Sequence, residues 1–342
     1  MSSQLDIRHQ QSLRGLNTFG TDVKAALYLR VAGLDDLRAV RADPFLSTQK
    51  HLVLGGGSNL LLTRDVDGLV LHMSNTGIAV TGEDEHYVYV TAQAGENWHA
   101  LVQWTLVHGY PGLENLSLIP GSVGAAPIQN IGAYGVELSD VFHSLKAFDF
   151  ATGDVISLAK ADCQFAYRES IFKQALRERT VILEVTCALP KRWRPNIRYA
   201  ELAAELEAWG VSQPLPTDIS EAVITIRRRK LPDPEKIGNA GSFFKNPVVS
   251  RDEHARLLAA YPQLISYPQA DGTVKLAAGW LIDQCGWKGK SLGRAAVHDR
   301  QALVLVNLGG ASGAQLLELA TLIQCNVRER FGVSLEPEPV IL

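Results

Sequence analysis

The stretch His51-Leu-Val-Leu-Gly-Gly-Gly-Ser-Asn59 places three glycines, a serine and an asparagine directly after a short apolar run. The apolar run predicts a buried strand, and the glycines allow backbone N–H groups to converge on an anion such as a diphosphate. The stretch is not a P-loop, because no lysine followed by serine or threonine comes after it. It also lacks the third glycine and the following helix of a dinucleotide-binding fingerprint. Taken alone, it fits a structural turn as well as an anion site.

A second glycine-rich stretch favours the anion site. Ile119-Pro-Gly-Ser-Val-Gly-Ala-Ala-Pro-Ile-Gln-Asn-Ile-Gly-Ala-Tyr-Gly135 carries four glycines and no charge. A neutral surface rich in peptide groups suits a large, flat, partly apolar cofactor that bears a diphosphate. The alternative is an Ω-loop that is packed by its own side chains. Two such loops in one strand-rich region make the cofactor the better interpretation.

Short apolar or alternating runs predict strands around these two loops. They cover residues 25–31, 51–54, 60–63, 68–73, 78–81 and 87–94. A helix is expected over residues 96–108, a hairpin over 144–158 and a further strand over 180–189. The first part of the chain is therefore expected to be α+β with many strands.

The composition changes near Pro214-Leu-Pro216, which suggests a domain boundary. Beyond it, the sequence predicts helices over residues 218–230, 276–285 and 313–330, and strands over 302–307 and 333–340. We therefore expect two lobes of a cofactor-binding region and a smaller α+β domain after them. Their expected bounds are residues 13–72, 73–210 and 215–342.

Composition and charge exclude several classes of function. The chain has 342 residues and a net charge of −3, so it shows no preference for nucleic acid or another polyanion. The polar residues 1–11 do not resemble a secretory signal, and prolines and glycines interrupt the longest uncharged stretch, residues 116–136. The four cysteines and nine histidines lack the spacings of zinc, redox or catalytic metal sites. We expect a cytoplasmic monomer without a metal, a nucleic-acid partner or a membrane partner.

Six motifs occur in one order along most of the chain. They are Leu16-Asn-Thr-Phe-Gly20, Gly55-Gly-Gly-Ser-Asn59, Ile119-Pro-Gly-Ser-Val-Gly124, Pro127-Ile-Gln-Asn-Ile-Gly-Ala-Tyr-Gly135, Tyr167-Arg-Glu-Ser-Ile-Phe172 and Gly241-Ser-Phe-Phe-Lys-Asn-Pro247. In this order they resemble the UDP-N-acetylenolpyruvoylglucosamine reductases, the MurB family, over residues 16 to about 338. Several long motifs in sequence are far more specific than any single glycine pattern.

The resemblance implies a fold, a cofactor and a reaction. The fold is a vanillyl-alcohol-oxidase/PCMH-type FAD-binding fold followed by a smaller α+β substrate-binding domain. Non-covalently bound FAD and the hydride donor NADPH would reduce the enolpyruvyl ether of UDP-N-acetylglucosamine to UDP-N-acetylmuramate, a peptidoglycan precursor. The implied FAD-binding residues are Gly55, Gly56, Gly57, Ser58, Asn59, Ile119, Pro120, Gly121, Ser122, Gly124, Ala125, Gln129, Asn130, Gly132 and Gly135.

The resemblance also implies residues that bind the sugar-nucleotide substrate. Residues 267–282 are similar to the first subtype of the family, in which a tyrosine-bearing loop closes over the substrate. Lys230 matches a lysine that contacts the diphosphate, although the cluster Arg227-Arg-Arg-Lys230 also suits the end of a helix. The full implied set is Tyr167, Tyr199, Lys230, Asn246, Tyr267, Lys275 and Gln301.

Arg168 and Ser242 are the residues that the implied chemistry needs most. Hydride delivery to the vinyl carbon leaves negative charge on the adjacent carbon and its carboxylate, and a guanidinium such as Arg168 stabilises that charge. The carbanion must then receive a proton, and because it is strongly basic a serine hydroxyl such as Ser242 can supply it. An exposed strand-end arginine and a capping or turn serine are the structural alternatives. Only the motifs around the two residues favour the catalytic roles.

A carboxylate is expected beside the enolate, and Leu335-Glu-Pro-Glu-Pro-Val340 supplies two candidates. The match to the family places the catalytic glutamate at Glu338. Relatives usually continue with valine and arginine, whereas this chain continues with Pro339-Val340, so Glu336 stays open as the alternative.

Two other functions are compatible with parts of the sequence. A sugar-nucleotide-binding regulator that has lost flavin chemistry would not need Arg168, Ser242 and both glycine loops. An oxidase of the same flavin superfamily would not need Arg168 and Ser242 as a pair. The reductase is therefore the leading hypothesis.

Overall fold

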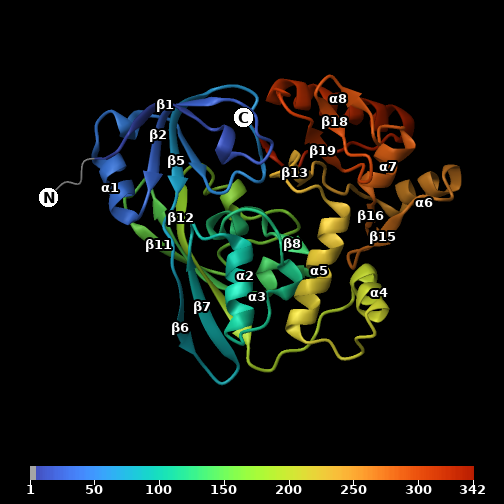
Figure 1. Cartoon of the computed structure of the whole chain (residues 1–342), viewed down its shortest axis with the longest axis horizontal. Coiled ribbons are helices and arrows are strands. Elements are labelled where there is room, and N and C mark those ends of the chain that lie inside the picture. Colours follow the sequence, from blue (N-terminus) through green and yellow to red (C-terminus); the bar gives the residue numbers. More distant parts are fainter. Residues whose placement is uncertain (1–4) are drawn as a thin grey trace. The chain divides into compact units, whose positions relative to one another are not determined.

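The computed structural model describes residues 5–342, which form two compact units (Figure 1). Among these residues, unit 1 comprises residues 5–11, 25–57 and 66–229. Unit 2 comprises residues 12–24, 58–65 and 230–342. Both units are therefore built from segments that are discontinuous in the sequence.

The first sheet of unit 1 has the strand order β1-β2-β5-β3. Its strands are β1 (Arg8–Ser12), β2 (Lys24–Val31), β5 (Val66–Met73) and β3 (His51–Leu54), and the last three are parallel. Alternate residues of β2, including Leu27 and Leu29, pack on Leu37 and Val40 of helix α1 (Leu34–Ala42). This alternation is the one that the sequence pattern predicts.

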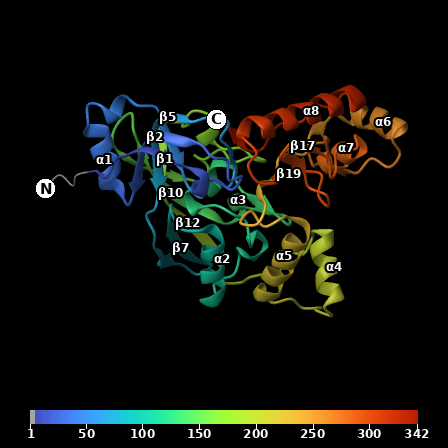
Figure 2. The same ribbon diagram turned by 45° about the horizontal axis from the view of Figure 1, so that its top comes forward.

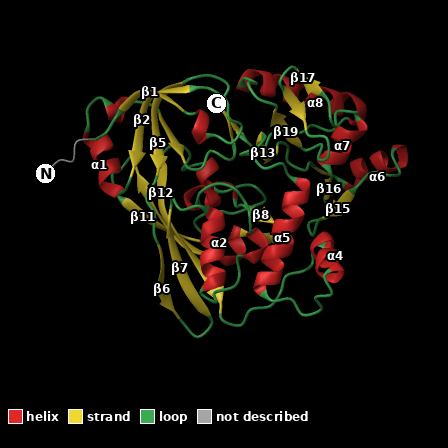
Figure 3. Ribbon diagram, viewed as in Figure 1, coloured by secondary structure: helices red, strands yellow, loops and turns green. Residues whose placement is uncertain are grey.

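The second sheet of unit 1 is antiparallel, with the order β11-β10-β12-β7-β6. Its strands are β11 (Val155–Ala159), β10 (Phe142–Asp149), β12 (Thr180–Pro190), β7 (Tyr87–Gln93) and β6 (Ile78–Glu83). Helix α2 (Trp98–Val107) lies beside this sheet (Figure 3). Its buried Trp98 packs in the core with strand residues such as Val90 and Leu145. The small elements β8 (Gly132–Ala133), β9 (Val136–Glu137) and α3 (Leu138–Val141) follow the second glycine-rich loop.

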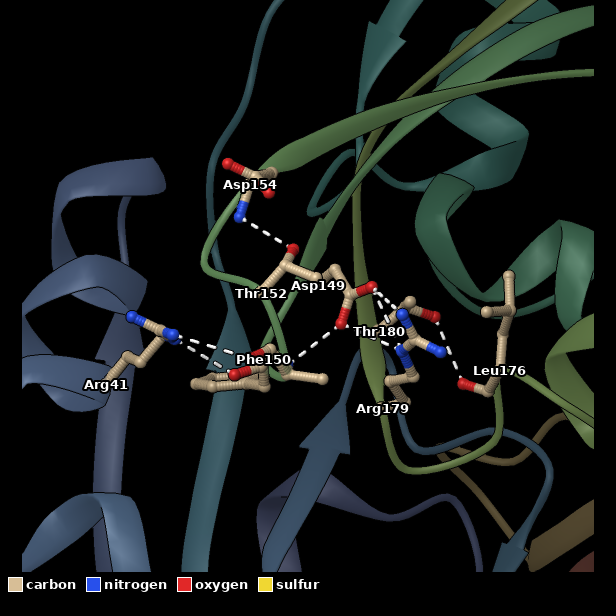
Figure 4. A network of polar contacts seen from close by, with 9 residues as sticks. Arg41, Asp149, Phe150, Thr152, Asp154, Leu176, Arg179 and Thr180 are labelled. Carbon is tan, nitrogen blue, oxygen red and sulfur yellow. Dashed lines mark hydrogen bonds and ion pairs between the residues drawn. The ribbon is translucent and has the colours of Figure 1, made fainter.

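A polar network fastens the hairpin between β10 and β11 (Figure 4). Asp149, whose side chain is 2% exposed, accepts hydrogen bonds from Nε of Arg179 at 2.9 and 3.0 Å. These bonds lower the pKa of Asp149. Arg41 of α1 donates to the carbonyl oxygen of Phe150 at 3.0 Å, so the network also joins the hairpin to the first sheet's helix.

Helices α4 (Ala200–Ala208) and α5 (Pro216–Lys230) lie side by side in unit 1 (Figures 1 and 2). Leu202 and Leu206 of α4 share a buried cluster with Ile219, Val223 and Ile226 of α5. Because this cluster holds α5 to the first unit, the boundary falls at Arg229/Lys230 and not near residue 215, where the prolines suggested it.

Besides the two-stranded pair of β4 (Leu60–Leu61) and β20 (Val340–Ile341), unit 2 contains three α-helices and two small sheets. Their order is β13-β19-β18-β17 and β14-β16-β15. The elements are β13 (Gly238–Ser242), β14 (Val248–Val249), α6 (Arg251–Ala260), β15 (Ser266–Pro268), β16 (Val274–Leu276), α7 (Ala278–Gln284), β17 (Ser291–Leu292), β18 (Ala295–Val297), β19 (Val304–Asn307) and α8 (Gly313–Phe331). None of the helices within residues 5–342 is long and apolar enough to cross a membrane.

The amino-terminal segment of unit 2 is part of its core. Phe19 is 1% exposed and packs edge-on against Phe243. Its carbonyl oxygen accepts a hydrogen bond from Nδ2 of Asn307 at 2.9 Å. A side chain at Gly238 would meet the same carbonyl, so only glycine permits this approach.

The carboxy-terminal segment differs from the strand expected over residues 333–340. Only β20 (Val340–Ile341) is a strand, and it pairs in parallel with β4 (Leu60–Leu61). Before it, Pro337 makes a single antiparallel bridge with Phe244. Pro337 and Pro339 have no N–H to donate, so a continuous ladder cannot form here.

Candidate active site

The two glycine-rich loops lie against each other in unit 1. A methyl group on Gly56 would lie 3.0 Å from Cα of Gly121, and one on Gly55 would lie 3.2 Å from Cβ of Ser122. Gly57 and Gly121 have φ angles of 59° and 115°, which side chains rarely permit. The absence of side chains between the loops lets the two backbones approach each other closely.

The second loop is fastened to its neighbours by its backbone. The N–H of Gly124 donates to the carbonyl oxygen of Ala94 at 2.8 Å, and that of Val123 donates to Glu96 at 2.8 Å. In return, the carbonyl oxygen of Gly121 accepts from the N–H of Trp98 at 3.0 Å. The loop is therefore held by the end of β7 and the start of α2, and not by its own side chains alone.

Leu118, directly before this loop, has a left-handed φ of 58° and is held from both sides. Its N–H donates to Nδ1 of His99 at 3.0 Å, and its carbonyl oxygen accepts from Nε of Arg227 at 3.1 Å. Burial lowers the pKa of His99, and nearby Arg228 and Arg227 add to this effect, which keeps the imidazole a neutral acceptor. The sequence reasoning missed His99 and assigned no such role to Arg227, because neither lies in a glycine motif.

Arg168 lies in a tight turn and also has a left-handed φ, of 56°. Its Nη2 donates to the carbonyl oxygen of Gly132 at 2.8 Å, and its guanidinium lies 5.2 Å from the centre of the Tyr167 ring. Non-glycine residues in this region are strained, and such strain gathers at functional sites. The structure thus brings Arg168 and Tyr167 to the end of the second glycine-rich stretch.

Two further bonds join the Arg168 turn to the segment before Gly132. Oγ of Ser170 donates to the carbonyl oxygen of Ile128 at 2.6 Å. Nδ2 of Asn130 lies 3.3 Å from the carbonyl oxygen of Ala166 and 2.9 Å from Oε2 of Glu137. The Asn130 side chain, predicted to bind the cofactor, is thus engaged in contacts within the protein.

Tyr199 lies beside Tyr134 in unit 1, with the two rings edge-on and their centres 5.1 Å apart. Tyr134 has a φ of 50°, and Nδ2 of Asn115 donates to its carbonyl oxygen at 3.0 Å. Burial raises the pKa of Tyr134 to about 12. Tyr199 is 43% exposed, so a ligand can reach it.

Ser242 ends strand β13 in unit 2, directly after Gly241, whose φ is 69°. Within the described residues, the Ser242 hydroxyl makes no hydrogen bond, in contrast to Ser250 and Ser312, which cap helices. The rings of Phe243 and Phe244 are buried beside it. The hydroxyl is therefore not used as a cap or in a turn.

The carboxy-terminal segment bonds the backbone of Glu338 to Phe243, the residue that follows Ser242. The N–H of Glu338 donates to the carbonyl oxygen of Phe243 at 2.8 Å, and its own carbonyl oxygen accepts from Nδ2 of Asn59 at 3.3 Å. Glu336 instead pairs with Nζ of Lys245 at 3.2 Å, and its side chain is 73% exposed. Of the two glutamates, the partly buried Glu338 is the better candidate for a carboxylate that acts with Ser242.

Two of the other predicted substrate residues of unit 2, Asn246 and Gln301, lie near the start of α7. Tyr267 and Lys275 stand opposite each other on β15 and β16. Oδ1 of Asn246 accepts from the N–H of Ala278 at 3.0 Å, and Oε1 of Gln301 would lie 3.4 Å from a methyl group on Gly279. Lys230 is the first residue of the third segment of unit 2.

The predicted site residues divide between the units. Unit 1 holds Gly55, Gly56, Gly57, Ile119, Pro120, Gly121, Ser122, Gly124, Ala125, Gln129, Asn130, Gly132, Gly135, Tyr167, Arg168 and Tyr199. Unit 2 holds Ser58, Asn59, Lys230, Ser242, Asn246, Tyr267, Lys275, Gln301 and Glu338.

Two family models match separate parts of the chain. Residues 25–159 match a family model described as an FAD binding domain, and residues 233–342 match one described as the UDP-N-acetylenolpyruvoylglucosamine reductase C-terminal domain. UDP-N-acetylenolpyruvoylglucosamine reductase of Burkholderia multivorans is 56% identical over 342 residues, covering 99% of this chain and 98% of the relative. That of Paraburkholderia phymatum is 56% identical over 332 residues, covering 96% of each.

The fold also matches that of a solved structure. The crystal structure of UDP-N-acetylenolpyruvylglucosamine reductase from Thermus caldophilus aligns with a TM-score of 0.69 and 24% identity, covering 99% of this chain and 98% of that one. Together with the family models, this match confirms the expected α+β fold with an FAD-binding first part.

Proposed function

The chain belongs to the UDP-N-acetylenolpyruvoylglucosamine reductase (MurB) family, and from this premise we propose which of its residues carry out the reaction. It is an FAD-dependent oxidoreductase that uses NADPH to reduce the enolpyruvyl ether of UDP-N-acetylglucosamine to UDP-N-acetylmuramate. The product is a precursor of peptidoglycan. The chemistry that FAD supplies when bound is hydride transfer, first from NADPH and then to the vinyl carbon of the substrate.

The residues of unit 1 fit this cofactor. Gly55 and Gly56 approach Gly121 and Ser122 so closely that side chains would collide, and peptide groups line the approach. Oriented peptide N–H groups bind a diphosphate well, and they do so without charged side chains. We assign non-covalent binding of FAD to these loops.

Arg168 binds the carboxylate of the enolpyruvyl group in our proposal. A guanidinium stays protonated and can meet a carboxylate with two N–H groups. The bond from Arg168 to Gly132 uses Nη2 and holds the group beside the second glycine loop. As negative charge develops on the substrate, this fixed cation lowers the energy of the enolate.

Ser242 donates the proton that completes the reduction, and Glu338 acts beside it. Two observations within unit 2 support this assignment: the Ser242 hydroxyl makes no hydrogen bond to the described residues, and the backbone of Glu338 bonds to the adjacent Phe243. A structural serine would be expected to bond the backbone nearby. The sugar nucleotide is assigned to Tyr167, Tyr199, Lys230, Asn246, Tyr267, Lys275 and Gln301.

The finer expectations about partners and location are part of the proposal. The chain is expected to act as a monomer in the cytoplasm and to bind no nucleic acid. The net charge of −3 supports the last point, because nucleic-acid binding relies on an excess of positive charge.

The visible spectrum of the purified protein tests the function directly. Oxidised flavin absorbs visible light, so the protein should be yellow, should bleach with NADPH and should regain its colour on addition of the enolpyruvyl substrate under anaerobic conditions. A colourless protein that takes up no FAD would support the regulator hypothesis instead. Flavin that NADPH bleaches but only oxygen restores would support the oxidase hypothesis.

Gly56→Ala should weaken FAD binding by about 10-fold or more, since the new methyl group would press on the backbone of Gly121. The dissociation constant can be measured by quenching of flavin fluorescence as FAD is added to the apoprotein. Gly82→Ala is the matched control, because its methyl group would meet only a ring carbon of Tyr89, at 3.7 Å. Equal affinities for the two variants would contradict the assignment of the loops.

A further inference from the structure

We propose that Glu137 is a positioning residue that aims the guanidinium of Arg168 at the substrate carboxylate. The inference rests on the role proposed for Arg168 above. Neither the glycine motifs nor the Tyr-Arg motif assigns a role to Glu137, which lies between them in the sequence, on strand β9.

The hairpin of β8 and β9 brings Glu137 to Arg168. Gly132 and Glu137 are paired residues of this hairpin. A methyl group on Gly132 would lie 2.9 Å from Cγ of Glu137 and 3.1 Å from Nη1 of Arg168. Cγ of Glu137 and Nη1 of Arg168 therefore both lie close to the position that a side chain at residue 132 would occupy.

The carboxylate of Glu137 is itself held in place. Its Oε2 accepts a hydrogen bond from Nδ2 of Asn130 at 2.9 Å. Asn130 in turn accepts the N–H of Ser139 on Oδ1 at 2.9 Å and has a left-handed φ of 44°. The backbone N–H of Glu137 donates to Asp140 at 2.9 Å. A carboxylate fixed in this way can hold a mobile partner in one orientation.

Arg168 needs such a partner because its side chain, unlike its backbone, has many accessible rotamers. The backbone is fixed by the turn and by Nζ of Lys173, which donates to the carbonyl oxygen of Arg168 at 2.8 Å. The guanidinium has five N–H donors on a planar group, and its Nη2 donates to the carbonyl oxygen of Gly132. A negative charge near Nη1 limits rotation of the group and so favours one orientation toward the substrate. Orientation of this kind governs rate, since small displacements of a catalytic group are costly.

The test is Glu137→Ala, with both half-reactions followed by stopped-flow absorbance of the holoenzyme. Bleaching by NADPH should keep its wild-type rate, whereas reoxidation by the enolpyruvyl substrate should slow by about 10-fold. Glu137→Gln, which keeps the shape and the acceptor oxygen, should recover part of the loss. Glu83→Ala, which removes an exposed carboxylate paired with Lys191, is the control and should leave both rates unchanged.

A double-variant cycle separates this inference from the function on which it rests. If Glu137 acts through Arg168, adding Glu137→Ala to Arg168→Ala should slow reoxidation no further. Wild-type reoxidation in Arg168→Ala would overturn the proposed role of Arg168 itself. Slow reoxidation in Arg168→Ala together with wild-type reoxidation in Glu137→Ala would overturn the positioning role alone. A double variant whose loss of rate is the product of the two single losses would do the same. A lower thermal midpoint of Glu137→Ala together with slower NADPH bleaching would assign Glu137 a purely structural role. If the alanine variant does not fold, the bleaching and reoxidation rates of Glu137→Gln decide instead.

Discussion

In Ser242→Ala, NADPH should bleach the flavin at the wild-type rate, while reoxidation by the enolpyruvyl substrate should slow by about 10²-fold or more. Hydride transfer from NADPH requires no proton from this serine, so the first half-reaction is unaffected. The second half-reaction leaves a carbanion that must be protonated at carbon. Without the hydroxyl, only water or a more distant group can supply that proton.

Rapid mixing of substrate with the pre-reduced enzyme under anaerobic conditions measures the second step alone. Ser250→Ala is a suitable control, because Ser250 caps α6 and its loss should lower stability without changing either rate. The same half-reaction rates in Ser242→Ala and the wild type would show that Ser242 is not the proton donor. A loss in both half-reactions would point instead to a damaged fold.

Local patterns predicted most of the strands and the two glycine loops. Strand β2 lies where the alternation of apolar residues predicted a strand, and the hairpin of β10 and β11 lies where the turn residues predicted a hairpin. Helices α1, α4 and α6 were missed. Each is short, and each buries only a few apolar residues, such as Leu257 in α6, so the apolar periodicity is weak.

The contacts that shape the site come from residues distant in sequence. Leu118 is held by His99 on α2 and by Arg227 on α5, and no local pattern links these three. The discontinuity of the units has the same origin. Residues 58–65 join unit 2 because β4 pairs with β20, at the other end of the chain. Sequence periodicity reports which face of an element is buried and not which element covers it.

The identity of the catalytic carboxylate illustrates this limit. Glu336 and Glu338 lie two residues apart, and the family match predicted Glu338 while leaving Glu336 open as the alternative. The structure separates them by their partners, because Glu336 pairs with Lys245 near solvent whereas the backbone of Glu338 bonds to Phe243 beside Ser242. The bridge between Pro337 and Phe244 belongs to this register and supports the proposal of Glu338.

Glu338→Gln should therefore slow reoxidation by the enolpyruvyl substrate by about 10²-fold, whereas Glu336→Gln should stay within about two-fold of the wild type. Glutamine preserves the size of the side chain but removes the charge, so a large loss reports on the carboxylate and not on packing. Stopped-flow reoxidation gives both values, and NADPH bleaching in the same preparations checks that FAD is bound and reactive. The exposed pair of Glu336 with Lys245 adds little energy, so the thermal midpoint of that variant should barely move. Slow reoxidation in Glu336→Gln with near-wild-type reoxidation in Glu338→Gln would place the catalytic carboxylate at Glu336. That result would require a different register, in which the N–H of Glu336 and not that of Glu338 bonds to the carbonyl oxygen of Phe243.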